Sequence, residues 1–159
     1  VYTAELANDL GNLANRSISM ILRYRDGHVP HGARTSLDEQ IPDTLVRYRA
    51  AMDANLLHQG IAAAMELTGA ANAFVEERAP WSQAKDPAQS DELDATLAGL
   101  ARALAALTTM LEPFMPERMQ RLAGDLGMST IPLLDQVAEL DLAGHTVQRG
   151  DVLFPRPDR

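Results

Sequence analysis

Hydrophobic and polar positions follow a helical period from the start of the chain and predict a helix over about residues 3–24. At about 3.6 residues per turn, one side of this helix gathers mostly apolar residues, namely Leu6, Leu10, Leu13, Ser17, Met20, Ile21 and Tyr24. The opposite side carries amides and arginines but few acids, namely Asn8, Asn12, Arg16, Ser19 and Arg23. Asp26-Gly27 then ends the helix, and a loop containing Pro30 and Gly32 follows.

Two further helices are expected in the middle of the chain. One begins near Pro42, a residue suited to a first helical turn, and runs to about Leu57. The next covers about residues 61–78, and Gly60 before it marks a break or a tight packing point. Ala79-Pro80-Trp81 ends this helix because the residue before a proline is disfavoured in the α region. Residues 82–90 are then expected to form a loop.

A stripe of leucines gives the strongest periodicity in the chain. Its members are spaced alternately four and three residues apart, namely Leu93, Leu97, Leu100, Leu104, Leu107 and Leu111. In a single chain of this size, such a stripe is more typical of a buried seam in a helix bundle than of a coiled-coil dimer. Beyond Pro113 and Pro116, residues 117–126 predict one more helix, and a short helical turn is expected within 133–140.

These elements predict an all-α fold, an antiparallel bundle of about five helices over residues 1–142, followed by an irregular, extended C-terminal tail over residues 143–159. The length of 159 residues fits one domain. Aromatic residues make up only 4% of the chain, whereas strands are enriched in aromatic and β-branched residues, so composition also favours helices.

Several classes of site are excluded or disfavoured by composition. The chain has no cysteine, which excludes disulfides and thiol catalysis. The four histidines show no metal-ligand spacing, so no metal is expected. No apolar run reaches the ~18 residues that span a bilayer, and no signal peptide opens the chain. We therefore expect a cytoplasmic protein, and the start at Val1 suggests a piece of a longer one.

The net charge of −8 disfavours a protein that grips duplex nucleic acid, because phosphate neutralisation needs a basic surface. The charge is unevenly distributed, however. Residues 1–34 hold four arginines and three acidic residues, whereas most of the acidic residues lie downstream. A protein that binds a few unpaired bases needs only a local basic face, so charge alone leaves that function open.

Candidate chemistry is concentrated at five residues. Asn8, Asn12 and Arg16 stand four residues apart and therefore form one polar row on a helix face. The single tryptophan, Trp81, directly follows Pro80. Amides and a guanidinium can hydrogen-bond the edge of an unpaired base, and an indole gives that base a flat surface to stack on. These residues predict a base-binding site.

Other interpretations remain open at this level. The polar row could be a solvated helix face, although asparagine is a poor helix former and Asn15 adds a third one to the same stretch. Trp81 could be a core anchor, and Lys85 and Asp86 could be ordinary loop residues. The chain has no nucleotide-binding glycine loop, no paired histidine and carboxylate, and no serine or threonine beside a plausible base. We expect no catalytic residues.

Four segments resemble one known family in order along the chain. Residues 6–16 (LANDLGNLANR), together with Met20-Ile21 and residues 26–30 (DGHVP), closely resemble the start of the anticodon-binding domain of bacterial methionyl-tRNA synthetases. Residues 77–81 (ERAPW) with 84–86 (AKD) look like its second signature. Residues 111–116 (LEPFMP) resemble the third, and residues 153–156 (LFPR) the closing segment.

The resemblance implies an α-helix bundle that recognises the CAU anticodon of initiator and elongator methionine tRNAs. Asn12 and Arg16 match positions that contact the first anticodon base, Trp81 matches the indole that stacks on it, and Asn8 and Pro80 match further recognition positions. ATP and methionine would be used by a class I catalytic domain that this chain lacks, so the chain alone is expected to be inactive and to need no cofactor. That catalytic domain would be its partner in the parent enzyme.

Two other functions are compatible with the sequence. The domain could be the equivalent module of a sister class I synthetase, which would prefer a different anticodon. It could also be a helical adaptor that binds a partner protein through an apolar or methionine-rich surface, which would respond to no tRNA. A purely structural bundle is a further alternative.

Overall fold

The computed structural model describes residues 2–149, and the side chains from residue 4 onward. Within that range the chain forms seven α-helices and one 3-10 helix, as follows: α1 (Tyr2–Arg25), α2 (Ser36–Asp53), α3 (Leu57–Arg78), α4 (Pro80–Gln83), η1 (Pro87–Gln89), α5 (Ser90–Leu111), α6 (Pro116–Asp125) and α7 (Leu134–Val137). Five of these helices have ten residues or more, so the prediction of an all-α fold with about five helices is confirmed.

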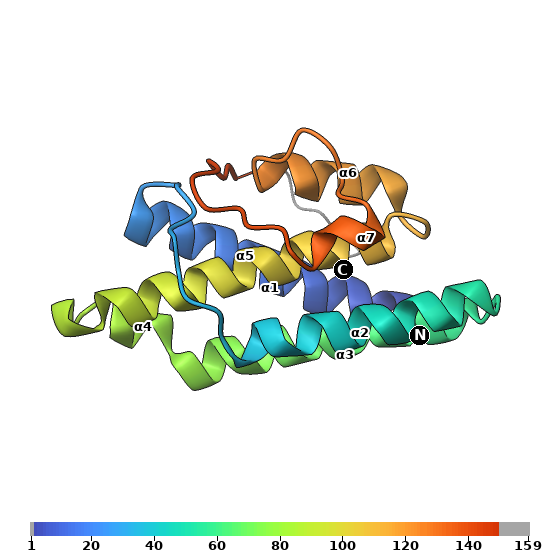
Figure 1. The fold of residues 1–159 in the computed structure, drawn as a ribbon. Helices are drawn as coiled ribbons and strands as arrows, with labels where there is room; N and C mark the ends of the chain where they lie inside the picture. Colours follow the sequence, from blue (N-terminus) through green and yellow to red (C-terminus); the bar gives the residue numbers. More distant parts are fainter. Residues whose placement is uncertain (1, 150–159) are drawn as a thin grey trace, which may run out of the picture.

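The four longest helices lie side by side as an elongated bundle (Figure 1). α1 and α3 run in one direction, while α2 and α5 run in the other, so α2 and α3 form an antiparallel hairpin and α5 packs antiparallel to α3 (Figure 1). α6 and α7 pack on α5. This arrangement places the middle of α1 beside the second half of α3, which positions the site described below.

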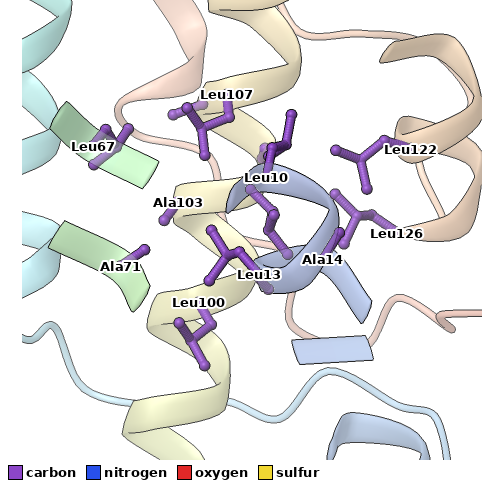
Figure 2. Packing of buried hydrophobic residues seen from close by; sticks show 14 of the residues in the cluster. Leu10, Leu13, Ala14, Leu67, Ala71, Leu100, Ala103, Leu107, Leu122 and Leu126 are labelled. Atoms are coloured by element: carbon purple, nitrogen blue, oxygen red, sulfur yellow. The ribbon is translucent and has the colours of Figure 1, made fainter. Parts of the chain in front are cut away.

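The predicted leucine stripe forms the centre of the core. All six of its leucines are buried, with at most 2% of each residue exposed, which confirms the bundle seam. Figure 2 shows Leu100 and Leu107 of α5 among Leu10 and Leu13 of α1 and Leu67 of α3. Alanines fill the positions between the leucines, so other helices approach α5 closely and bury nearly every face of it.

The expected start of the second helix near Pro42 is wrong, because α2 begins at Ser36 and Pro42 lies inside it. Thr35 precedes the helix and donates from its backbone N–H (2.8 Å) and from Oγ1 (3.0 Å) to Asp38 Oδ2. Asp38 in turn forms a buried ion pair with Arg102 of α5, with Arg102 Nε 2.6 Å from Oδ1. These contacts stabilise the first turn of α2 by more than the loss of the one backbone hydrogen bond that Pro42 cannot donate, so the helix begins before the proline.

Two other expectations about the middle of the chain need correction. The third helix begins at Leu57, so Gly60 is not a break but a packing point, where an added Cβ would lie 2.8 Å from Met52 Sδ. The segment expected to be a loop over residues 82–90 contains the end of α4 and all of η1. The predicted end of the third helix at Arg78 is confirmed.

The segment after α7 pairs with the loop after α1. His28 and Thr146 form an antiparallel bridge, and Val147 N donates to Gly27 O at 2.8 Å. Val147 is buried, while residues 150–159 of the predicted tail lie outside the described part of the chain. The domain boundary at residue 142 stays a prediction. None of the described helices is long and apolar enough to cross a membrane.

Candidate nucleic-acid interface

Trp81 lies on a sharp turn between α3 and α5. Ala79 ends α3 in the left-handed conformation (φ 46°, ψ 64°), and Pro80 is the first residue of the short helix α4. Pro80 is buried, whereas Trp81 remains 38% exposed. α4 lies at the end of the bundle where α3 ends and α5 begins (Figure 1). It therefore presents a partly exposed indole at that end.

Arg16, in the middle of α1, lies beside this indole. Its guanidinium carbon is 5.9 Å from the centre of the Trp81 ring, within the range of a cation–π contact. Its Nη2 also donates to Glu76 Oε1 of α3 at 2.8 Å. The guanidinium is thus held between an aromatic ring and a carboxylate, and the 65% exposure of the Glu76 side chain leaves that ion pair open to solvent.

The Arg16–Trp81 pair borders a shallow hollow of about 350 Å³. The residues that line it come from α1 and α4, namely Asn15, Arg16, Ser19, Met20, Tyr24 and Trp81. The chain that follows α7 reaches this rim, where Arg149 Nη2 donates to Ser19 Oγ at 2.9 Å. An indole, a phenol ring, a guanidinium and an amide therefore surround one opening, and this set suits a flat ligand with a hydrogen-bonding edge.

Of the five predicted site residues, the structure brings two together, namely Arg16 and Trp81. Pro80 precedes Trp81 in the chain but is buried and does not line the hollow. Asn12 and Asn8 are exposed on α1, one and two turns before Arg16, at about 6 and 12 Å along the helix axis. Neither of them lines the hollow. They extend the polar row away from the indole, so a ligand that contacts both asparagines as well as Arg16 and Trp81 must cover two turns of α1.

Sequence reasoning missed several residues of the hollow. Met20 and Tyr24 were placed on the apolar side of the first helix, but they are only half-buried and line the hollow. A signal was present, because they follow Arg16 by four and eight residues and therefore share its face. Glu76 gave no such signal, since its pairing with Arg16 depends on how α1 packs against α3.

A larger hollow, of about 460 Å³, lies between α2 and α3. It is lined mainly by alanines and by the Arg47–Glu66 ion pair, and no aromatic ring borders it. Because stacking needs a ring, we place the base-binding candidate at Trp81 and not at the larger hollow.

The fold and this surface define an all-α bundle that presents an indole beside a guanidinium. Among known families, the model described as the anticodon-binding domain of methionyl tRNA ligase matches residues 26–157. The chain belongs to this family.

Similar proteins of known sequence or structure carry the same family name. The methionine–tRNA ligase of Lactiplantibacillus plantarum is 33% identical over 165 residues, which cover 97% of this chain and 24% of the relative. That of Bacillus subtilis is 33% identical over 161 residues, covering 96% and 24%. The structure is similar to free Mycobacterium tuberculosis methionyl-tRNA synthetase, with a TM-score of 0.87 at 26% identity over 99% of this chain and 34% of that one. The chain thus spans about a quarter of the length of these curated relatives.

Proposed function

We propose that this domain recognises the CAU anticodon loop of the initiator and elongator methionine tRNAs. In this proposal the first anticodon base stacks on Trp81, while Arg16 and Asn12 hydrogen-bond its edge. Asn8 contacts the loop further along α1, and Pro80 fixes the turn that carries the indole.

The observation that carries the proposal is the contact between Arg16 and Trp81 at the edge of an open hollow. Stacking of a base on an aromatic side chain contributes ~1–3 kcal/mol and tolerates any base, so Trp81 supplies affinity. Discrimination comes from the polar groups, because a wrong base leaves them buried without a partner at a cost of ~1–3 kcal/mol each.

The placement of the asparagines sets a requirement on the RNA. Asn12 lies one helical turn outside the hollow, so a base stacked on Trp81 must present its edge along α1 to reach the amide. Arg23, exposed further along α1, and Arg149 at the rim put guanidinium groups near the hollow although the whole chain carries a net charge of −8. We assign phosphate contacts to this local basic face.

The relatives suggest the wider context. Because the chain spans 24% of proteins named methionine–tRNA ligase, we propose that a catalytic domain elsewhere in the parent protein uses ATP to attach methionine to the tRNA bound here. The domain by itself would supply anticodon specificity and no catalysis. We place the protein in the cytoplasm, as part of protein biosynthesis.

A titration followed through Trp81 tests the proposal. Since Trp81 is the single tryptophan, its fluorescence is measured while a CAU anticodon stem-loop is added at low salt, and again with a stem-loop altered only at the first anticodon base. Saturable quenching by the first and little by the second is expected. Preference for another anticodon would indicate a sister synthetase, and no response of Trp81 to either loop would favour an adaptor.

A further inference from the structure

The turn that carries Trp81 is joined to α5 by a small polar network, none of whose members lines the hollow. Thr96 Oγ1 accepts a hydrogen bond from Arg78 Nε at 2.9 Å and donates to Gln83 Oε1 at 3.0 Å, with the carbonyl of Glu92 at 2.9 Å competing for the same proton. Arg78 is the last residue of α3, and Gln83 is the last residue of α4. One hydroxyl therefore joins both ends of the turn.

The central residues of this network are buried in the protein interior. Thr96 is fully buried and Gln83 is 6% exposed, so an unpaired group here would be costly. At the solvent-exposed side of the network, Arg78 Nη2 donates to Glu92 Oε2 at 2.8 Å and to the Glu92 carbonyl at 3.1 Å. Its guanidinium carbon also lies 5.6 Å from the centre of the Phe74 ring.

The turn needs this support, because it has little stability of its own. A helix of four residues is far below the length at which helices persist in water, and Ala79 holds a left-handed conformation that is unfavourable for a residue with a Cβ. Trp81 lies between the two tied ends, and its own side chain is partly in solvent. The residues that flank this turn on both sides of Trp81 are thus held by hydrogen bonds to Thr96.

We propose that Thr96, together with Arg78 and Gln83, positions the indole of Trp81 for stacking. These residues contact no RNA and act through Trp81 alone. A ring held in its binding orientation loses less conformational freedom when a base stacks on it, so the network raises affinity for the anticodon loop without contributing a contact. The inference rests on the proposed function and identifies what holds its stacking surface in place.

The decisive variant is Thr96→Val, which removes the hydroxyl but keeps the shape and the net charge. Thr108→Val is the matched control, because Thr108 is also fully buried on α5 but its hydroxyl donates to the Ala105 carbonyl of the same helix. Thr96→Ser keeps a hydroxyl and should restore the wild-type properties. Two quantities are measured on each folded variant, namely the fluorescence anisotropy of Trp81 in the free protein and the Kd for a labelled CAU stem-loop.

Thr96→Val is expected to lower the anisotropy and to raise the Kd about fivefold, the equivalent of one lost hydrogen bond, whereas Thr108→Val changes neither. In a Trp81→Ala background, Thr96→Val should leave the Kd of the labelled RNA unchanged, because the residue through which it acts is gone.

Unchanged anisotropy in Thr96→Val, or an equal rise in Kd with and without Trp81, would overturn the inference. Failure of the proposed function has a different signature, in which the wild-type parent protein binds no stem-loop at all. In that case the anisotropy of the free protein still decides whether Thr96 positions the indole.

Discussion

The guanidinium of Arg16 makes a cation–π contact with the indole of Trp81, its central carbon lying 5.9 Å from the centre of the ring. Arg16 comes from the first helix, whereas Trp81 comes from the turn between α3 and α5. Glu76 pairs with the same guanidinium at 2.8 Å. A cation, an aromatic ring and a carboxylate therefore meet at the place where the proposed base would bind.

Replacing Trp81 by alanine should weaken binding to every stem-loop, whatever its first anticodon base. Loss of stacking predicts a decrease of ~1–3 kcal/mol in binding free energy for matched and mismatched loops alike. Trp81→Phe keeps a ring and should retain part of the affinity. The Kd values are measured with labelled RNA, and a selective loss for the matched loop alone would contradict this assignment.

Replacing Asn12 by alanine should chiefly relax the choice at the first anticodon base. The amide is exposed in the free protein, so its loss should leave stability within about 0.5 kcal/mol. The ratio of Kd values for loops that differ only at this base should fall by a factor of about 5–10, since one hydrogen-bonding partner is lost. Equal losses for all four bases would show that Asn12 supplies affinity and not discrimination.

Glu76→Gln should tighten binding of all stem-loops at low salt. The substitution removes a negative charge beside the site and frees Arg16 to contact RNA. Its cost to stability should be small, because exposed ion pairs contribute ~0–1 kcal/mol. Glu66→Gln is the matched control, as Glu66 pairs with Arg47 across α2 and α3 and its loss changes the net charge equally. If both variants tighten binding by the same factor, the effect comes from overall charge and not from Arg16.

The buried pair of Asp38 and Arg102 should make the bundle sensitive to acid. Burial raises the pKa of Asp38, but hydrogen bonds from Arg102 and Thr35 and the charge of Arg102 outweigh it, so the pKa lies below its usual 3.8. Because the folded pKa is the lower one, the stabilisation is complete above pH 3.8 and is lost as the pH falls through the lowered value.

Asp38→Asn tests this relationship. At pH 7 the variant removes the nearer carboxylate from buried Arg102 and leaves only Asp141 Oδ1, 3.7 Å from Nη1. Urea unfolding should show a loss of ~3 kcal/mol, the lower end of the range for a broken buried pair. The difference from the wild type should shrink below pH 3.8, because the Asp38 carboxylate of the unfolded chain becomes protonated there and folding must remove that proton until the pH falls below the lowered pKa of the folded state. A difference that stays constant between pH 7 and pH 3 would rule out this ion pair as the source of acid sensitivity.

The sequence predicted the bundle well because its core is periodic. Leu97, Leu100 and Leu104 repeat at helical spacing, and such a pattern directly specifies a buried face. The start of α2 was missed because Pro42 was taken as a boundary, whereas Thr35 and Asp38, three residues apart, cap the helix earlier. A local capping signal was present in the sequence and outweighed the proline.

The site was predictable only in part, for a physical reason. Arg16 and Trp81 were identified by their chemistry, since few side chains can stack on or hydrogen-bond a base. Their contact with each other, and the pairing with Glu76, depend on the packing of α1 against α3 and cannot be obtained from local sequence. The support of the turn by Thr96 is of the same kind, because a buried threonine in an alanine-rich helix resembles any other core position.

The most direct test of stacking on Trp81 uses its indole N–H. As the single tryptophan, it gives one side-chain indole signal in a proton–nitrogen NMR spectrum, which needs no assignment by mutation. If the first anticodon base stacks on the ring, a CAU stem-loop should shift this signal saturably, and a loop altered at the first base should shift it much less. An indole signal that stays in place while the CAU loop binds elsewhere on the protein would contradict the account.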